Sequence, residues 1–584
     1  MRILKNNPDS NFSHQLYLKY FIIFSRHTTT ANKKDNKMTT ASVSEKHPRG
    51  LYVLFATEMW ERFNYYGMRA ILVYFITQAL MYNKVFSSQM YGGYTSLMYL
   101  TPLVGGYIAD RYWGNRRSIM FGGIVMAIAE IVLFFCSYFY KSNPDLSTWF
   151  FYMGLGLMIA GNGFFKPNIS SMVGQLYKTG DKRTDSAYTI FYMGINLGGM
   201  IGPFVCGLVG NTGNPDDFKW AFLAGSIGMV ISVITMYKLK DKYLVSYDNK
   251  PIGETPEAMV NSTSILRKPL SPGGIGLIIV IAAIAMGLLY LHGKEIFDLT
   301  WLLLASLLLI LYVIFSDKSL TKIETQRIIA IFVVSFFVVF FWSAYEQAGA
   351  SLSFFAAEQT KLHIDFLNYS IPPSWFQSVP SFFVVIFAPV FAWLWIQLGK
   401  KNVEPSSPFK MAIGLFLLML GYAWIAIGVK DLAPNVKVSM IWLTGMYALH
   451  VFGELCLSPI GLSLVNKLAP LRFASLLMAV WFMANAAANV LAGKLSALYP
   501  PGPAEAIKAE KAGIELAPIL NGSVTPSADQ IAKLKELEIP FHYSSFLGFE
   551  IHNLYDFFML FVVMSGVAAF ILFLLTRWLK KMMN

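Results

Sequence analysis

The sequence predicts an all-α polytopic membrane protein, and both its composition and its long apolar segments support this fold class. Of the 584 residues, 55% are hydrophobic and 14% are charged, whereas soluble proteins carry about 25% charged residues. A helix needs about 20 predominantly apolar residues to span a bilayer. Segments of this kind recur along the chain, and we expect fourteen transmembrane helices, at about 51–80, 87–111, 117–139, 148–176, 184–211, 218–238, 275–292, 299–316, 327–353, 374–398, 410–428, 438–466, 472–497 and 554–578.

The distribution of Lys and Arg predicts the orientation in the membrane. The net charge is +13, and the cations gather in alternate connections, for example at Arg116 and Arg117 and at Lys400 and Lys401. Short loops rich in Lys and Arg stay in the cytoplasm, which explains the charge without a nucleic-acid partner. The prediction is a multi-pass protein of the cell (inner) membrane with both termini in the cytoplasm.

The segments divide the chain into four parts. The first two are a polar cytoplasmic tail expected to be disordered (1–50, with Met38 as an alternative start) and an N-terminal six-helix bundle (51–238). The last two are a cytoplasmic linker with an inserted transmembrane hairpin (239–326, spans 275–292 and 299–316) and a C-terminal six-helix bundle with an extracytoplasmic loop (327–584, loop 498–553). Paired six-helix halves around a site at the membrane midplane are the architecture of many secondary transporters. The division therefore favours a transporter.

The inserted hairpin and the loop differ from the rest of the chain. The two hairpin spans hold almost no polar residues, and uniform apolarity predicts lipid contact all round and a peripheral position. The loop contains PPGP and ADQIAKLKELEIP, which predicts one or two short surface helices outside the membrane. Two interpretations of the loop stay open: it is a binding site for a partner, or it is a connecting loop with no binding role. We favour the second.

The first span carries charges that a membrane helix normally lacks. At about 100° per residue, one stripe of the helix holds its charged and phenolic residues. The stripe consists of Glu58, Arg62, Tyr65 and Arg69, with Glu61 and Tyr66 on its flanks. Each charge at a helix centre costs roughly 2.5 to 3.5 kcal/mol on the insertion scale, so the stripe should face protein or a water-filled cavity. An ion-pair network that only positions helices is the alternative, but such groups usually mark ion or substrate paths.

Charged groups in other spans are candidate partners for this stripe. Lys166, followed by Pro167, lies in the fourth span and needs an anion. Glu346 in the ninth segment and Glu454 in the twelfth are the intramembrane carboxylates of the second half. Arg69 and Lys166 therefore have two candidate partners across the bundle.

His450 lies four residues before Glu454, on the same helix face. A proton relay and a simple packing role are both open, and packing is favoured.

Six motifs, in the same order, resemble those of the proton-dependent oligopeptide transporter (POT) family of the major facilitator superfamily. They are Glu58-x-x-Glu61-Arg62, GGYIADR, Lys166-Pro167, FYxxINLG around Asn196, Trp342 with Glu346-Gln347, and GELxLSP around Glu454 and Ser458. The resemblance implies the major facilitator fold, two six-helix halves with an extra hairpin between them, fourteen helices in all.

The resemblance also implies roles for individual residues. Proton coupling falls to Glu58, Glu61, Arg62 and Glu346, with Glu346 a gate residue that pairs with Arg69. The substrate carboxylate falls to Arg69 and Lys166, and the substrate amino end to Glu454 and Asn196. The implied pocket lining is Tyr65, Tyr66, Tyr99, Trp342, Ser458 and Trp481.

Two positions depart from the family pattern. Pro380 stands where many members carry an asparagine near the substrate amino end, which puts substrate preference in doubt. Gly92 stands where mammalian members have a histidine, which suggests proton handling without that group.

The implied function is a monomeric, proton-coupled symporter that imports di- and tripeptides across the cytoplasmic membrane by alternating access. It needs no cofactor, and the proton is the coupling ion. The alternatives are the same fold carrying another small solute, such as nitrate, a peptide-like drug or a modified amino acid, and a peptide sensor that no longer transports. We expect no enzyme, because no nucleophile and base pair, metal cluster or phosphate loop stands at useful spacing.

Overall fold

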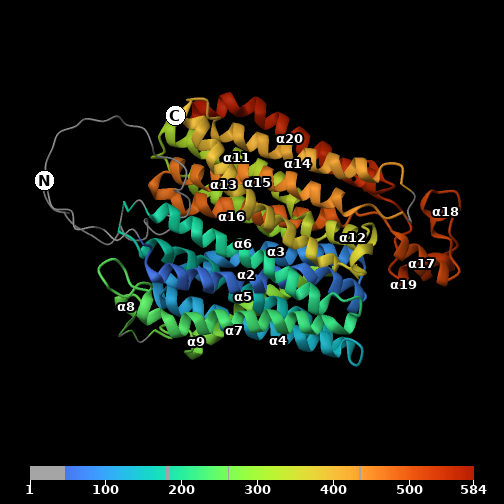
Figure 1. Cartoon of the computed structure of the whole chain (residues 1–584), viewed down its shortest axis with the longest axis horizontal. Helices are drawn as coiled ribbons and strands as arrows, with labels where there is room; N and C mark the ends of the chain where they lie inside the picture. Colours follow the sequence, from blue (N-terminus) through green and yellow to red (C-terminus); the bar gives the residue numbers. More distant parts are fainter. Residues whose placement is uncertain are drawn as a thin grey trace.

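The computed structural model describes residues 46–583 except 179, 182, 261, 263 and 433–435. The predictions for the tail before residue 46, Met38 included, lie outside the described residues. Figure 1 shows long helices running side by side, with connections at two opposite ends. The C-terminus and α8 (Glu257–Val260) lie at one end, and α17–α19 lie at the other.

Each predicted segment corresponds to a long helix, and the described residues hold fourteen helices of 17 to 32 residues. They are α2 (Arg49–Tyr74), α3 (Lys84–Ile108), α4 (Asn115–Phe139), α5 (Pro144–Gln175), α6 (Arg183–Gly210), α7 (Phe218–Tyr243), α9 (Pro272–Gly293), α10 (Leu299–Phe315), α11 (Lys322–Tyr345), α13 (Ser378–Lys400), α14 (Ser407–Val429), α15 (Met440–Leu468), α16 (Ala474–Ser496) and α20 (Leu554–Met583). By length and composition, ten helices in the described part of the chain are apolar enough to cross a membrane. The all-α polytopic class is thus confirmed, and the count of fourteen crossings stays a prediction.

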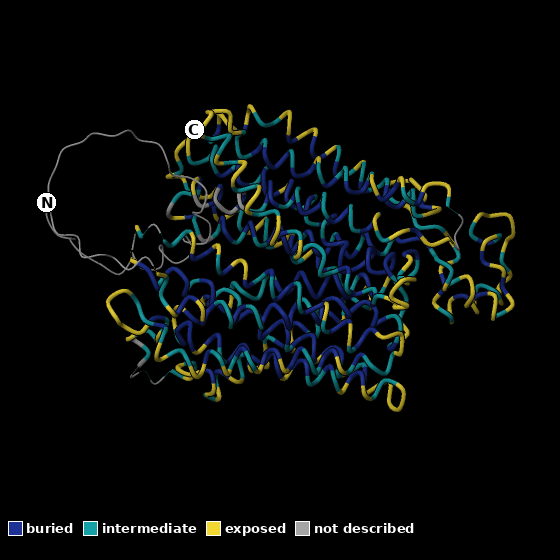
Figure 2. Tube along the Cα trace, in the orientation of Figure 1, coloured by how far each residue is buried: buried dark blue, intermediate teal, exposed yellow. Residues whose placement is uncertain are grey.

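Helices α2–α7 pack mainly on one another, and α11–α20 do the same (Figure 1). In Figure 2 the buried residues follow the inner faces of the helices, and the exposed residues lie mainly at the helix ends and on the outer faces. The two groups meet most closely where α3 crosses α16. A Cβ atom on Gly92 would lie 2.8 Å from the Cα atom of Gly493, so small residues allow this approach. Gly92, singled out above for lacking a histidine, serves here as a packing position.

The prediction that the inserted hairpin contacts lipid all round is wrong for both spans: α9 has a buried face, and α10 packs on α16 and buries Leu299, Leu303 and Ile314. One face of α9, which includes Ile278, Ala282 and Leu289, is buried against α5 and α3. A Cβ atom on Gly156 of α5 would lie 2.7 Å from the backbone oxygen of Ala282. A glycine on the neighbouring helix makes this close contact possible, and the apolar pattern of the hairpin alone did not reveal it.

The predicted span 327–353 is not one continuous helix. Helix α11 ends at Tyr345, a 3-10 turn (Glu346–Gly349) follows, and α12 (Ser351–Glu358) continues the chain. The amide of Gln347 donates hydrogen bonds to the backbone oxygens of Ser343 and Ala492, both at 3.0 Å. These bonds hold the break against α16, and they place Glu346 at an interrupted helix, where transporters often form their sites.

The loop 498–553 folds into more than the one or two helices predicted. It contains α17 (Pro503–Lys511), α18 (Leu516–Leu520), α19 (Ala528–Glu536) and the antiparallel strands β3 (Ser544–Phe546) and β4 (Phe549–Ile551). A small apolar cluster joins these helices: Ala509, Ile514, Leu516, Ile519, Leu534 and Ile539. A second short antiparallel pair, β1 (His363–Ile364) and β2 (Tyr369–Ser370), lies between α12 and α13.

Candidate functional site

The charged stripe of α2 forms a buried ion cluster. Arg62 pairs through its Nε atom with Glu58 Oε1 and with Glu61 Oε2, each at 2.8 Å. All three side chains are buried, so the attraction is little screened by water. Asn162 of α5 adds a hydrogen bond from its amide to Glu61 Oε1, at 3.1 Å. The structure therefore joins the three residues of the Glu-x-x-Glu-Arg motif to one another and to α5.

A second buried ion pair connects the two groups of helices. Arg69 Nη2 lies 2.7 Å from Oε2 of Glu346, at the helix break after α11. The Tyr91 hydroxyl donates to the same Glu346 oxygen, at 3.3 Å. The guanidinium group also lies over the rings of Tyr66 and Tyr91, 5.7 and 5.6 Å from their centroids. The pairing of Arg69 with Glu346, which the family resemblance implied, is thus present.

Lys166 lies in the interior of α5 and forms no ion pair with another described residue. Its ammonium group lies 4.6 Å from the centroid of the Tyr99 ring, a cation-π contact that partly replaces solvation. No ion pair of Lys166 occurs among the described residues. Lys166 thus presents a cation beside an aromatic face, with no carboxylate of the described residues paired to it.

Glu454 on α15 is the complementary group in the other half of the chain. The Tyr345 hydroxyl donates to Glu454 Oε2 at 2.5 Å, and the Trp342 ring lies edge-on to Tyr345 with centroids 5.2 Å apart. Glu454 forms no ion pair within the described part of the chain. Ser458 follows one turn later on α15. The described residues around Glu454 thus supply hydroxyl and aromatic groups.

Asn196 and His450 both contact neighbouring protein groups and not Glu454 in the described part of the chain. The Asn196 amide donates to the backbone oxygen of Tyr192, four residues earlier, at 3.0 Å, and no hydrogen bond to Glu454 is present among the described residues. His450 lies against the Tyr422 ring, with centroids 4.8 Å apart, while Glu454 is bonded by Tyr345. This arrangement supports the packing role for His450.

The aromatic residues predicted to line a pocket do not gather in one place: Tyr99 lies at Lys166 and Trp342 beside Tyr345, as described above. Tyr65 and Tyr66 lie edge to face on α2, with ring centroids 5.1 Å apart, and both rings face arginines of the stripe. Trp481, by contrast, is buried where α16 meets α15. A Cβ atom on Gly461 would lie 1.9 Å from the Trp481 ring, so Trp481 fills the space that this glycine leaves.

Several contact residues escaped the sequence reasoning. Asn162, Tyr91 and Tyr345 bind the predicted carboxylates. The sequence could have indicated the contact of Asn162, because this residue lies four residues before Lys166 and therefore on the same helix face. The sequence did not indicate the contact of Tyr91, because Tyr91 reaches Glu346 only where α3 approaches the 3-10 turn after α11.

Glu130 is a buried carboxylate that the sequence reasoning overlooked. It is the acidic residue of α4, an otherwise apolar segment, so the signal used for Glu346 and Glu454 was available. It is fully buried, and the Asn64 amide donates to its Oε1 atom at 2.7 Å. No ion pair of Glu130 occurs in the described part of the chain, in contrast to Glu58 and Glu61.

Within the described residues, no three side chains of His, Cys, Asp or Glu are grouped to hold a metal ion. The cysteines Cys136, Cys206 and Cys456 are free and buried.

A family model described as "POT family" matches residues 116–511. The chain belongs to the POT family. Members of this family are transporters, not enzymes. The described part of the chain contains several helices that are apolar enough to cross a membrane. Because the chain also belongs to a family of transporters, it is a multi-pass membrane protein.

Individual relatives resemble this POT-family chain over most of its length. It is 37% identical to the "Uncharacterized transporter YclF" of Bacillus subtilis over 478 residues, 80% of this chain and 92% of the relative. It is 33% identical to the "Peptide transporter YePEPT" of Yersinia enterocolitica, over 76% of this chain and 87% of the relative. For the "Di-/tripeptide transporter" of Lactococcus lactis subsp. cremoris the identity is 30%, over 77% and 90%.

Solved structures resemble the POT-family chain in the same way. A variant of the peptide transporter POT in complex with alafosfalin superposes with a TM-score of 0.70 at 28% identity, covering 93% of this chain and 97% of the other. A POT family transporter in complex with 5-aminolevulinic acid gives a TM-score of 0.67 at 26% identity, covering 92% and 98%.

Proposed function

We propose that this protein is a proton-coupled symporter that imports di- and tripeptides by alternating access. One observation carries the proposal. The cation Lys166 lies in one group of helices and the carboxylate Glu454 in the other, and neither forms an ion pair within the described part of the chain. A short peptide is a zwitterion, with a carboxylate for Lys166 and an ammonium group for Glu454. Relatives named as peptide and di-/tripeptide transporters support this substrate class.

The two buried ion clusters supply the proposed coupling to protons. Glu61 shares Arg62 with Glu58, and Glu346 depends on Arg69 across the two groups of helices. A buried carboxylate that loses its cationic partner takes up a proton more readily. Separating the groups breaks the Arg69–Glu346 pair, so protonation and the direction of opening are linked. A proton entering at about 100 mV adds roughly 2.3 kcal/mol to uptake.

The proposal includes the arrangement in the cell. The end of the molecule with the C-terminus and the Lys- and Arg-rich connections faces the cytoplasm, in agreement with the positive-inside rule. The protein lies in the cell (inner) membrane as a monomer, with both termini in the cytoplasm. The two six-helix halves, 51–238 and 327–584, move relative to each other, and the hairpin of 239–326 stays peripheral.

Uptake of labelled dialanine into proteoliposomes tests the proposal. With an inward proton gradient and a negative interior, we expect accumulation above the external concentration, suppressed by unlabelled tripeptide. Collapse of both gradients with a protonophore is the control and should leave only equilibration. Uptake that ignores the gradients would contradict symport.

A second candidate, the same fold carrying a peptide-like solute, rests on Pro380 and on the relative that binds 5-aminolevulinic acid. Proteoliposome uptake of labelled 5-aminolevulinic acid that excess unlabelled dialanine does not suppress would favour it. Binding without counterflow of labelled dialanine would instead indicate a sensor.

A further inference from the structure

The inserted hairpin divides its contacts between the two groups of helices. Helix α9 packs on α5 and α3 of the N-terminal group, α2–α7 (Figure 1), whereas α10 packs on α16 of the C-terminal group, α11–α20. Among the described residues, α9 and α10 pack far less closely on each other than on these partners. The two helices of the hairpin therefore share no extensive interface that would keep them together.

Close contacts attach α9 to the N-terminal group. A Cβ atom on Gly156 of α5 would lie 2.7 Å from a backbone oxygen of α9, and one on Gly93 of α3 would lie 2.9 Å from the His292 ring. Membrane helices that pack tightly place small residues at their contact. Gly276 and Gly287 of α9 itself meet no atom of the described residues within 4 Å of such a Cβ. The glycines of α9 are thus not used to approach α10.

The linker that leads into α9 is also attached to the N-terminal group. The indole of Trp113, just after α3, donates to the backbone oxygen of Leu266 at 2.7 Å. The backbone N–H of Arg116, in the first turn of α4, donates to the backbone oxygen of Gly253 at 2.9 Å. The chain before α9 and α9 itself are therefore held by the same group.

Helix α10 is attached to the C-terminal group at both of its ends. At its start, Lys494 of α16 pairs with Asp298 and donates to the Thr300 hydroxyl at 3.0 Å. At its other end, Arg472, which precedes α16, lies 3.1 Å from the carboxylate of Asp317. These contacts fix both ends of α10 to the same part of the C-terminal group.

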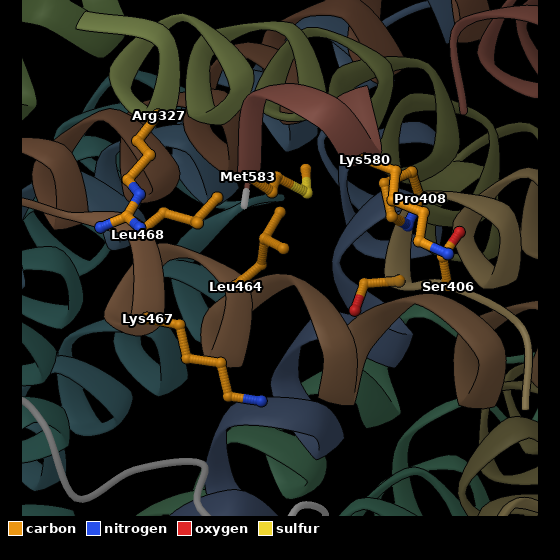
Figure 3. Close-up of a pocket in the computed structure, with 9 residues that line it drawn as sticks. Arg327, Ser406, Pro408, Leu464, Lys467, Leu468, Lys580 and Met583 are labelled. Carbon is orange, nitrogen blue, oxygen red and sulfur yellow. The ribbon is translucent and has the colours of Figure 1, made fainter. Parts of the chain in front are cut away.

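The chain after α10 enters the C-terminal group directly. Residues 316–321 are all that separates α10 from α11, and a connection this short limits how far the two helices can move apart. Arg327, in the first turns of α11, lines a cavity of about 360 Å³ together with residues of α14, α15 and α20, and Figure 3 shows it beside Leu468 of α15. The start of α11 is thus embedded among the C-terminal helices.

The turn of the hairpin, residues 294–298, lies where the two groups meet. Gly92 of α3 lies against Gly493 of α16 at this place. The next residue of each helix contacts the hairpin: Gly93 lies against the end of α9, and Lys494 pairs with Asp298. The turn therefore bridges the contact between α3 and α16.

We propose that α9 moves with the N-terminal group and α10 with the C-terminal group, so that the turn 294–298 is a strap between two moving parts. Because this division matters only in a molecule whose groups move, it rests on the proposed alternating access. The two helices of the hairpin then separate and approach in every transport cycle, while each keeps its contacts with its own group.

Distances between spin labels test the proposal in the full chain in lipid nanodiscs. Four exposed residues each report one element: Lys294 the end of α9, Trp301 the start of α10, Ser142 the connection of α4 to α5, and Lys437 the chain before α15. They are replaced by Cys in pairs and labelled, and the native cysteines are buried. Double electron–electron resonance then gives each distance without peptide and with excess dialanine.

Two of the distances should stay constant and three should change. The pairs Lys294–Ser142 and Trp301–Lys437 should keep their distances, because each pair lies within one group. The pairs Lys294–Lys437 and Trp301–Ser142 should shift by more than about 2 Å, the scale of domain rearrangements. The pair Ser142–Lys437 reports the movement of the groups themselves and should shift as well.

A hairpin that moves as one unit would overturn the proposal. In that case Lys294 and Trp301 would both keep their distances to Ser142, or both to Lys437, while the Ser142–Lys437 distance shifts. Shifts in all four hairpin distances would overturn it too, because the hairpin would then follow neither group. A constant Ser142–Lys437 distance would instead contradict alternating access itself, and the strap with it.

Discussion

At the scale of single residues, the buried carboxylates among the described residues fall into two kinds. Glu58, Glu61 and Glu346 pair with arginines, whereas Glu130 accepts one hydrogen bond from Asn64 and has no ion pair among the described residues. A carboxylate that shares or exchanges a cationic partner is suited to proton exchange, because a change in the pairing changes how readily it takes up a proton. A carboxylate held by an amide inside one group of helices is suited to packing. This difference predicts different outcomes for the same substitution.

Replacement of Glu61 by Gln should abolish proton-driven accumulation of dialanine and leave counterflow intact. Gln keeps the size and one acceptor but carries no exchangeable charge. Glu130→Gln is the matched control, since its amide oxygen still accepts from Asn64, and both activities should persist. Both are measured in proteoliposomes, and uphill uptake by the Glu61 variant would remove Glu61 from the coupling path.

Replacement of Lys166 by Ala should remove the preference for a free peptide carboxylate. Hydrogen bonds to charged groups contribute about 1.5 to 3 kcal/mol, so we expect the wild type to favour dialanine over its C-terminal amide by roughly ten- to a hundredfold. The variant should bind both with similar, weak affinity, as measured by competition with the labelled peptide. A preserved preference in the variant would move the carboxylate site elsewhere, with Arg69 the next candidate.

At the scale of elements, the loop 498–553 is tied to both groups of helices. Lys84 at the start of α3 lies 2.7 Å from Oε1 of Glu358 at the end of α12 and 3.0 Å from Oε1 of Glu505 on α17. The backbone N–H of Asn83 donates to Glu538 of the same loop at 3.1 Å. The loop is therefore an integral part of that end of the molecule.

Variants of the Lys84 ion pairs should differ in thermal stability, because they leave different charged groups without a partner. Glu505→Gln leaves Lys84 paired with Glu358, so we expect a loss of about 1 kcal/mol. Lys84→Gln leaves two largely buried carboxylates together, and the loss should reach about 3 kcal/mol. The unfolding temperatures in detergent should therefore decrease from wild type to Glu505→Gln to Lys84→Gln. Glu536→Gln, in the exposed pair with Lys533, should have no effect, and a reversed order would contradict this account.

At the scale of the whole molecule, the two groups of helices are held together at the end that carries α17–α19. Ser88 of α3 and Ser496 of α16 share a hydrogen bond at 2.8 Å, and the Tyr74 hydroxyl donates to the backbone oxygen of Ser353 at 2.8 Å. Alternating access requires these contacts to separate in every cycle.

Cysteines at Ser88 and Ser496 should lock the transporter when oxidised. The two Oγ atoms are 2.8 Å apart, so the side chains are close enough for a disulfide, and the native cysteines are buried. Oxidation should stop dialanine counterflow, and a reductant should restore it. Ser147→Cys is the matched control, because it faces Cys136 at 3.4 Å within one group of helices. Transport that continues through the Ser88–Ser496 disulfide would show that this end does not open.

The sequence alone determined the class of fold, the positions of the long helices and the residue types of the site. Membrane length and the cost of buried charge are local constraints, so apolar segments and misplaced charges such as Arg62 and Lys166 are visible without a structure. The tertiary structure decided the partners. The sequence pattern did not indicate that Tyr91 contacts Glu346, that α9 packs on Gly156, or that α11 stops at Tyr345. These features depend on contacts between segments far apart in the chain, which local periodicity does not encode.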